Sequence, residues 1–351
     1  MTTPKKLSYR DAGVDIDRAD AFVDRIRPMA ASTRTVYSMD SIGSFAGLLD
    51  LTKGSWREPL LVACTDGVGT KLKVAFETGC HQGVGIDLVA MSVNDLLVTG
   101  AQPLAFLDYL ATSRLDLDLH AAVVDSIAEG CRRSGCALLG GETAELPGFY
   151  QDDEYDLAGF AVGVVDRERM LSVDSVRAGD WVIGIPSDGL HSNGFSLVRK
   201  VFEDRSIYPI HRPLEGMTEP LGDVLLKPTR IYRREMETAA GIPGVRSAAH
   251  ITGGGIPGNL PRAVPDHLGI AVVRNTWPVH PIFEWIRKAG GIEEAEMDRT
   301  FNMGLGLMVV TAPDAARTLM RVLADQGFDS YRVGWITGEP GFRWVDRFES
   351  T

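Results

Sequence analysis

Apolar residues alternate along the chain between short continuous runs and longer segments with helical spacing. The short runs at 60–64, 181–186 and 305–311 have the length and aliphatic content of buried strands. Longer segments, such as 87–99 and 313–326, are followed directly by a glycine, as helix ends often are. Strands that alternate with helices in this way predict an α/β fold.

Turn residues and apolar spacing set the expected order of elements. We expect strands at 60–64, 104–110, 136–139, 156–165, 181–186, 246–251, 269–274, 305–311 and 331–336. We expect helices at 19–26, 87–99, 195–202, 230–240, 281–289 and 313–326, and one that Asp118 caps and Gly135 ends.

The grouping of these elements and the length of 351 residues predict two α/β (α+β) domains. Residues 1–57 are polar and irregular, and they include a glycine-containing loop. Residues 58–168 form the first predicted domain and residues 169–345 the second. The order of the strands within each sheet does not follow from the sequence.

Charge and composition exclude several classes of function. The formal net charge is −11, and no cluster of Lys and Arg is long enough to bind a nucleic acid or an anionic membrane. The four cysteines form no CxxC pair, which favours reduced thiols. The N-terminus is polar, unlike a secretory signal, and no apolar stretch approaches the roughly 20 residues of a membrane helix. We therefore expect a cytoplasmic protein with no nucleic-acid or membrane partner.

The first candidate site is the segment TDGVGTK at 65–71, directly after a predicted strand. Glycines at Gly67 and Gly69 allow the backbone to approach a ligand closely. Asp66 is a candidate metal ligand, and Thr70 and Lys71 are candidate phosphate contacts. The spacing matches neither a Walker A loop nor GxGxxG, so a plain turn at the strand end is an equally good interpretation.

The predicted helix 87–99 carries a polar stripe on an otherwise apolar surface. At about 100° per residue, Asn94 lies almost under Asp87, and Asp95 lies to one side. Such a stripe favours a cleft, with a solvated helix face as the alternative. The segment GGETAE at 140–145 also follows a strand, so Asp66, Asp95 and Glu142 are expected to converge as oxygen ligands for Mg²⁺. Surface turns are the alternative.

Two later segments also combine turns with polar groups. In SDGLHSNG at 187–194, Ser192 or Asn193 is expected to cap the next helix, and His191 is a candidate acid, base or phosphate partner. An ordinary capping turn with an uninvolved His is the alternative. HITGGGIPG at 250–258 contains a formal GxGxxG, but Pro257 and the lack of a βαβ context argue against a dinucleotide site. Such a loop still suits one phosphate. The turn before 305, with Asn302, is more simply structural.

The order of these motifs is more specific than any one of them. From about residue 7 to residue 338 the chain resembles the phosphoribosylformylglycinamidine cyclo-ligase family. The likeness is carried by SYRDAGVDID (8–17), TDGVGTK (65–71), GIDLVAMSVND (85–95), FLDY (106–109), GGETAELP (140–147), HSNGFSL (191–197), KPTRIY (227–232) and HITGGG (250–255).

The resemblance implies a homodimer that pairs its N-terminal domains and binds ATP near their interface. It implies conversion of formylglycinamidine ribonucleotide and ATP to aminoimidazole ribonucleotide, ADP and phosphate. Asp66, Asp95 and Glu142 would bind Mg²⁺, and Lys71, His191 and His250 would be catalytic, with His191 the first candidate for proton transfer. ATP would contact Gly67, Gly69, Thr70, Lys71, Asn94, Gly140 and Gly141; the substrate would contact Ser192, Asn193, Thr252, Gly253, Gly254 and Gly255.

One segment departs from the family pattern, because Ser44 and Ala46 stand where glycine is frequent. Selenophosphate synthetases need a reactive Cys or selenocysteine in that region, which has none. The matches after Gly179 do not favour the thiamine-phosphate kinases. The amidine-forming synthetase of the preceding step is much longer. The remaining alternatives are another ATP-using small-molecule kinase of this superfamily and an inactive nucleotide-binding regulator.

Overall fold

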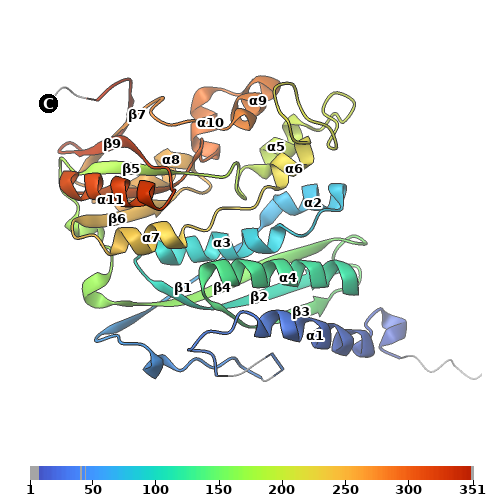
Figure 1. Cartoon of the computed structure of the whole chain (residues 1–351). Helices are drawn as coiled ribbons and strands as arrows, with labels where there is room; N and C mark the ends of the chain where they lie inside the picture. Colours follow the sequence, from blue (N-terminus) through green and yellow to red (C-terminus); the bar gives the residue numbers. More distant parts are fainter. Residues whose placement is uncertain (1–7, 40–41, 44, 349–351) are drawn as a thin grey trace, which may run out of the picture.

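The computed structural model describes residues 8–39, 42–43 and 45–348 of the chain. Two β-sheets lie one above the other, with helices between them and on their outer sides (Figure 1). The N-terminal part of the chain forms the lower sheet and the C-terminal part the upper one. Ser41 and Ser44, from the segment that departs from the family pattern, lie outside the described residues.

The N-terminal sheet has the strand order β1-β4-β2-β3. Its strands are β1 (Pro59–Gly67), β2 (Gln102–Thr112), β3 (Ala137–Glu145) and β4 (Tyr155–Asp166). Only β2 and β3 pair in parallel, because α4 (Leu117–Ser134) connects them as a crossover helix. α3 (Val84–Leu97) and α4 cover one face, and α1 (Ile16–Ala31) packs against α4 and β3.

The C-terminal sheet has the strand order β10-β7-β9-β5-β8-β6. Its strands are β5 (Trp181–Pro186), β6 (Val245–His250), β7 (Gly269–Val273), β8 (Leu305–Thr311), β9 (Tyr331–Thr337) and β10 (Gly341–Val345), and only β10 and β7 pair in parallel. The remaining helices are α2 (Leu72–Thr78), α5 (Phe195–Val201), α6 (Leu221–Leu226), α7 (Arg233–Ala240), α8 (Gly255–Asn259), α9 (Pro281–Gly290), α10 (Glu294–Thr300) and α11 (Pro313–Asp325).

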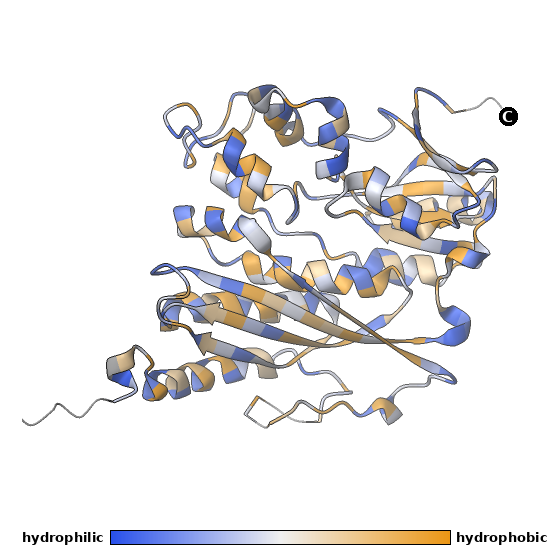
Figure 2. Cartoon of the chain, turned by 180° about the vertical axis from the view of Figure 1, so that it is seen from behind, coloured by the Kyte–Doolittle hydropathy of each residue, from blue (hydrophilic) through white to orange (hydrophobic). Residues whose placement is uncertain are grey.

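α3 is the structural centre of the molecule, since it packs on the N-terminal sheet, on α4 and on β6 and α7 of the C-terminal part. Almost every residue of α3 is buried. Gly85 allows α3 to approach α4 closely, since a Cβ at this position would lie only 2.2 Å from the Ser126 hydroxyl. Hydrophobic colour also runs along much of the four N-terminal strands (Figure 2). The core is therefore continuous from one sheet to the other.

The predicted α/β fold class is confirmed, whereas two predicted caps are wrong. Asp116, not Asp118, caps α4: its carboxylate accepts from the backbone N–H groups of residues 118 and 119 at 2.9 Å each. Gly194 occupies the N-cap of α5, so neither Ser192 nor Asn193 caps it. The Ser192 hydroxyl instead donates to Asp87. Short α2, α6 and α10 and the edge strand β10 carry too few residues for an apolar period and were not predicted.

Among the described residues, no helix combines the length and apolar character needed to cross a bilayer.

Candidate functional site

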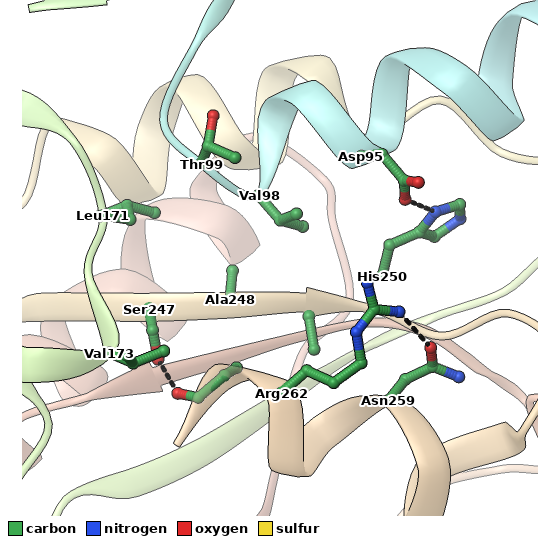
Figure 3. Close-up of a pocket in the computed structure, with 12 residues that line it drawn as sticks. Asp95, Val98, Thr99, Leu171, Val173, Ser247, Ala248, His250, Asn259 and Arg262 are labelled. Atoms are coloured by element: carbon green, nitrogen blue, oxygen red, sulfur yellow. Dashed lines mark hydrogen bonds and ion pairs between the residues drawn. The ribbon is translucent and has the colours of Figure 1, made fainter. Parts of the chain in front are cut away.

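Three predicted site residues meet where the two sheets approach each other. Asp66 lies near the end of β1, Asp95 near the end of α3, and His250 at the end of β6. Asp95 Oδ1 lies 2.9 Å from His250 Nδ1 (Figure 3). Burial raises the pKa of Asp66, and the charge of Asp95 raises it further. The chain thus brings two carboxylates and an imidazole within electrostatic range of one another.

The amide of Asn94 fixes the tautomer of His250. Its Oδ1 accepts from the Tyr232 backbone N–H at 3.0 Å, and its Nδ2 donates to the Arg230 carbonyl at 2.8 Å. The same Nδ2 lies 3.4 Å from His250 Nε2, so that nitrogen is an acceptor and the ring proton is on Nδ1, facing Asp95. Since its amide is buried and occupied, Asn94 is not the open ATP contact that the sequence predicts.

Asp95 and His250 line a cavity of about 290 Å³ between the end of α3 and β6. Figure 3 shows this cavity, with side chains from α3, β6 and the turn after α8 pointing into it. Its lining combines apolar residues with Thr99, Ser247 and Arg262. A small polar molecule therefore has room beside the Asp95–His250 pair.

Lys71 is wholly enclosed, and this corrects its expected role. Its ammonium lies 2.8 Å from the carboxylate of Asp87, and both side chains are 0% exposed. It also donates to the backbone carbonyls of His191 and Lys227, at 3.0 and 2.8 Å. Burial lowers the pKa of Lys71, and the charge of Asp87 opposes that shift. With its three donors occupied, Lys71 has no group to offer a phosphate in this structure.

Asp87 also accepts hydrogen bonds from the groups around the Lys71 ammonium. Oδ1 accepts from the Thr229 backbone N–H at 2.7 Å, from the Thr229 hydroxyl at 2.6 Å and from the Ser192 hydroxyl at 3.0 Å. Asp87 is on α3, whereas these donors belong to the C-terminal part of the chain. The buried Asp87 and Asn94 also show that the stripe on α3 is not a solvated face. Ser192 is held in this network and not at a ligand surface.

His191 is also buried, unlike an open proton donor. Its ring packs beside Tyr232 and so close to β8 that a Cβ at Gly306 would lie 2.5 Å from it. Burial lowers the pKa of His191 well below its usual value, helped by the charges of His250, Lys71 and Arg230. Nδ1 has no hydrogen-bond partner. A neutral, enclosed imidazole is better suited to holding its loop than to transferring protons.

Two glycine segments remain accessible around the site. Gly69 has a φ of 69° and open space where a Cβ would be, and the hydroxyl of Thr70 lies 3.1 Å from that of Ser196. Gly253 and Gly254 are exposed, and Asn193 Oδ1 lies 3.4 Å from the position of a Cβ on Gly253.

The buried side chain of Asn259 braces the second segment. It donates to the carbonyls of Thr252, Gly253 and Gly255 at 3.3, 3.1 and 2.9 Å. Gly254 N-caps the short helix α8, so the glycine-rich loop opens a helix. These bonds hold the loop in one conformation from behind and leave Gly253 and Gly254 facing outward.

Glu142 does not join Asp66 and Asp95, which corrects the expected three-carboxylate site. In the sheet register, Asp66 lies in the same row of residues as Gly141. Glu142 lies in the next row. Side chains of adjacent rows point to opposite faces of a sheet. Glu142 instead lines a second pocket of about 300 Å³ with Gly140, Gly141 and residues 42–43 and 45–47. Within the described part of the chain, no group of three His, Cys, Asp or Glu residues is placed to bind a metal.

Comparison with known proteins decides the family. Residues 46–165 match the family model described as "AIR synthase related protein, N-terminal domain", and residues 177–346 match its C-terminal counterpart. A phosphoribosylformylglycinamidine cyclo-ligase from Myxococcus xanthus is 52% identical over 334 residues, which is 95% of this chain and 97% of that protein. The chain belongs to the phosphoribosylformylglycinamidine cyclo-ligase family.

Solved structures share the fold of this cyclo-ligase family at low identity. E. coli HypE matches with a TM-score of 0.67 and 17% identity, over 95% of this chain and 96% of that one. A thiamine-monophosphate kinase from Stenotrophomonas maltophilia matches with a TM-score of 0.66 and 20% identity, over 93% and 96%. The family resemblance and the fold class predicted from the sequence are confirmed.

Sequence reasoning missed the two side chains that organise the cyclo-ligase site from behind. Asp87 was noticed only as part of a stripe, and Asn259 was not noticed at all. Asp87 accepts from Thr229, more than 100 positions away, and Asn259 donates to backbone carbonyls of the glycine loop. No spacing rule within one segment reveals such contacts.

Proposed function

We propose that this chain catalyses the ATP-dependent cyclisation of formylglycinamidine ribonucleotide to 5-aminoimidazole ribonucleotide in purine biosynthesis. The observation that carries the proposal is the Asp66, Asp95 and His250 group beside a cavity of about 290 Å³, in a chain of the cyclo-ligase family. A small-molecule kinase of the same fold has support from fold likeness alone.

The reaction needs an activated formamide, because oxide is a poor leaving group. The formamide oxygen attacks the γ-phosphorus of ATP, the bond to the β-phosphate oxygen breaks, and ADP leaves. An amidine nitrogen of the same molecule then attacks the formyl carbon and forms the ring C–N bond. The C–O bond breaks, inorganic phosphate departs, and protons are lost to give the aromatic ring. Positioning and charge neutralisation supply most of the catalysis.

His250 is the proposed proton acceptor in ring closure. Asp95 holds its Nδ1 proton and would stabilise the imidazolium, while Nε2 carries the lone pair and would give up its 3.4 Å contact with Asn94 Nδ2 to accept a proton. This arrangement favours His250 over His191, because a carboxylate faces the His250 ring, whereas burial and nearby positive charges strongly lower the pKa of His191. Lys71 and His191 would support the site by holding the two halves of the chain together.

Asp66 and Asp95 have the chemistry of a Mg²⁺ site. Two neighbouring carboxylates, one with a pKa raised by burial and by the other's charge, are relieved by a divalent cation with hard oxygen preference. Mg²⁺ bound there would neutralise phosphate charge during transfer. Glu142 lies on the other face of the sheet and is not part of this proposed pair.

ATP is proposed to place its phosphates near Asp66, where Gly67, Gly69 and Thr70 offer an accessible backbone and a hydroxyl. Its nucleoside would lie over the outer sheet face, in the pocket of about 300 Å³ lined by Gly140, Gly141 and Glu142. On the substrate side, Asn193 and the loop of Thr252, Gly253, Gly254 and Gly255 would contact the ribonucleotide.

A homodimer is proposed from the outer face of the N-terminal sheet. Leu61 of β1, Phe160 of β4 and Tyr109 of β2 are 68%, 45% and 38% exposed. The register places Phe160 opposite Thr65 of β1, in the same row of side chains as Leu107 of β2. A contiguous apolar face of this kind favours pairing with a second copy of the sheet. We expect the Leu61→Glu variant to sediment as a monomer, and the enzyme to act in the cytoplasm.

The direct test is production of the aminoimidazole nucleotide from formylglycinamidine ribonucleotide, Mg²⁺ and ATP, detected by its colour reaction after diazotisation. We expect product and ADP in equal amounts, with turnover lowered roughly 10²–10³-fold in Asp95→Asn. The exposed Asp125→Asn on α4 is the matched control and should keep full activity. ADP without product would favour the kinase alternative, and ATP binding without ADP would favour an inactive regulator.

A further inference from the structure

The cavity beside Asp95 and His250 carries charges of both signs. Asp95 stands at one wall, with Asp66 close enough for its pKa to be affected by the Asp95 charge. Arg262, from the turn after α8, supplies the guanidinium among the described residues that line the cavity. In Figure 3 its side chain extends from the turn toward His250 and Asn259. The cavity therefore suits a ligand that carries both an anionic and a basic group.

Arg262 has capacity left for an anion. It is exposed, and Nη1 donates to Asn259 Oδ1 at 3.3 Å. Within the described part of the chain, no carboxylate lies within ion-pair distance of its guanidinium. A guanidinium has five N–H donors in a planar fork, so most of them remain for a ligand.

Asn259 links Arg262 to the glycine loop. The same amide that contacts Arg262 through its oxygen donates through its nitrogen to the carbonyls of Thr252, Gly253 and Gly255. Arg262 is thus fixed relative to the loop that the proposed function gives to the substrate. An anion held by Arg262 would lie within the same cavity as the Asp95–His250 pair.

We propose that Arg262 binds the 5′-phosphate of the ribonucleotide and so sets the direction of the substrate in the cavity, an inference that rests on the proposed function. The substrate carries a phosphate dianion at one end and a basic amidine at the other. The phosphate is repelled by Asp66, Asp95 and the triphosphate of ATP, and attracted by the guanidinium. The amidine end then lies beside Asp95 and His250, where ring closure takes place.

The remaining lining is apolar and hydroxyl-bearing, as a sugar site would be. Val98, Leu171 and Ala248 contribute apolar surface, and Thr99 and Ser247 lie among them. A ribose between the phosphate and the amidine would pack against this lining.

The kinetic test compares Arg262→Met with Arg262→Lys and with Arg321→Met, an exposed arginine on α11. A charged phosphate contact predicts that Arg262→Met raises KM for formylglycinamidine ribonucleotide roughly 10- to 100-fold. KM for ATP and kcat should change less than about 3-fold, because the contact is equal in ground and transition states. Arg262→Lys should recover part of the loss, and Arg321→Met should behave as wild type. A rise in KM for ATP instead, or no rise at all, overturns the proposal.

A binding measurement separates this proposal from the proposed function. Ribose 5-phosphate, titrated calorimetrically into the full chain without ATP, should bind to wild type and to Arg321→Met and lose roughly 10-fold or more in affinity with Arg262→Met. Equal binding to wild type and Arg262→Met would overturn the phosphate assignment even if the enzyme makes product. Arg262-dependent binding by a chain that makes no product would keep the phosphate subsite and refute the cyclisation.

Discussion

Replacement of Lys71 by Met tests whether this residue holds the fold together or contacts ATP. Met preserves the length and apolar stem of the side chain but removes the ammonium, leaving the Asp87 carboxylate buried at 0% exposure without its cation. Three donors from Thr229 and Ser192 remain on Asp87, while the carbonyls of His191 and Lys227 lose theirs. Removing one partner of a buried ion pair costs about 3–5 kcal/mol.

The assay is a double-mutant cycle by urea unfolding, with Lys71→Met, Asp87→Asn and the double variant. The two single variants should each be strongly destabilised, and the double variant should lose at least about 1.5 kcal/mol less than their sum, because the groups act as one pair. ATP affinity of folded Lys71→Met should fall less than about 3-fold, against roughly 10- to 100-fold for a lost phosphate contact. A stable Lys71→Met variant that no longer binds ATP would refute the structural role and restore the role predicted from the sequence.

Three further changes have expected outcomes. Burial lowers the pKa of His120 to about 4, so the full free energy of unfolding should be present above pH 6.5 and fall by up to about 3 kcal/mol as the pH drops toward 4. The unfolding temperature should therefore change less between pH 7 and pH 5 in His120→Gln than in the exposed His267→Gln. Gly255→Ala should cost at least about 2 kcal/mol in urea unfolding, because its Cβ would lie 1.8 Å from the Asp298 carbonyl and its φ is 59°, whereas Gly258→Ala has open space and should fold normally. His250→Gln should lower kcat roughly 10²–10⁴-fold with little loss of stability, and a larger kcat effect for His191→Gln would reverse the proposed roles.

Local patterns predicted the sheets better than they predicted the site. The runs at 60–64, 181–186 and 305–311 became β1, β5 and β8 because a buried strand needs a continuous apolar segment, which the sequence displays directly. The order β1-β4-β2-β3 was not predictable, since it depends on the pairing of β1 with β4, whose paired residues are more than 90 positions apart.

The same limit explains the site. Asp66 and Asp95 were expected to converge from element ends, and His250 was a catalytic candidate from the resemblance; the structure places the three near one another. Lys71 was assigned to phosphate because it follows a glycine turn, and only the tertiary partner Asp87 reveals that its charge is used internally. Glu142 was expected with the two aspartates because nothing in a motif shows which face of a sheet a residue occupies, and a shift of one position reverses that face.

The most direct test of the central claim follows the oxygen of the formamide group. The enzyme is given formylglycinamidine ribonucleotide labelled with ¹⁸O in the formyl group, together with unlabelled ATP, and the phosphate released is analysed by mass spectrometry. If the γ-phosphoryl group is transferred to that oxygen before the ring closes, each released phosphate contains one ¹⁸O atom. The labelled phosphate should then form at the same rate as the aminoimidazole product. Unlabelled phosphate, with product still formed, would contradict the phosphorylated intermediate.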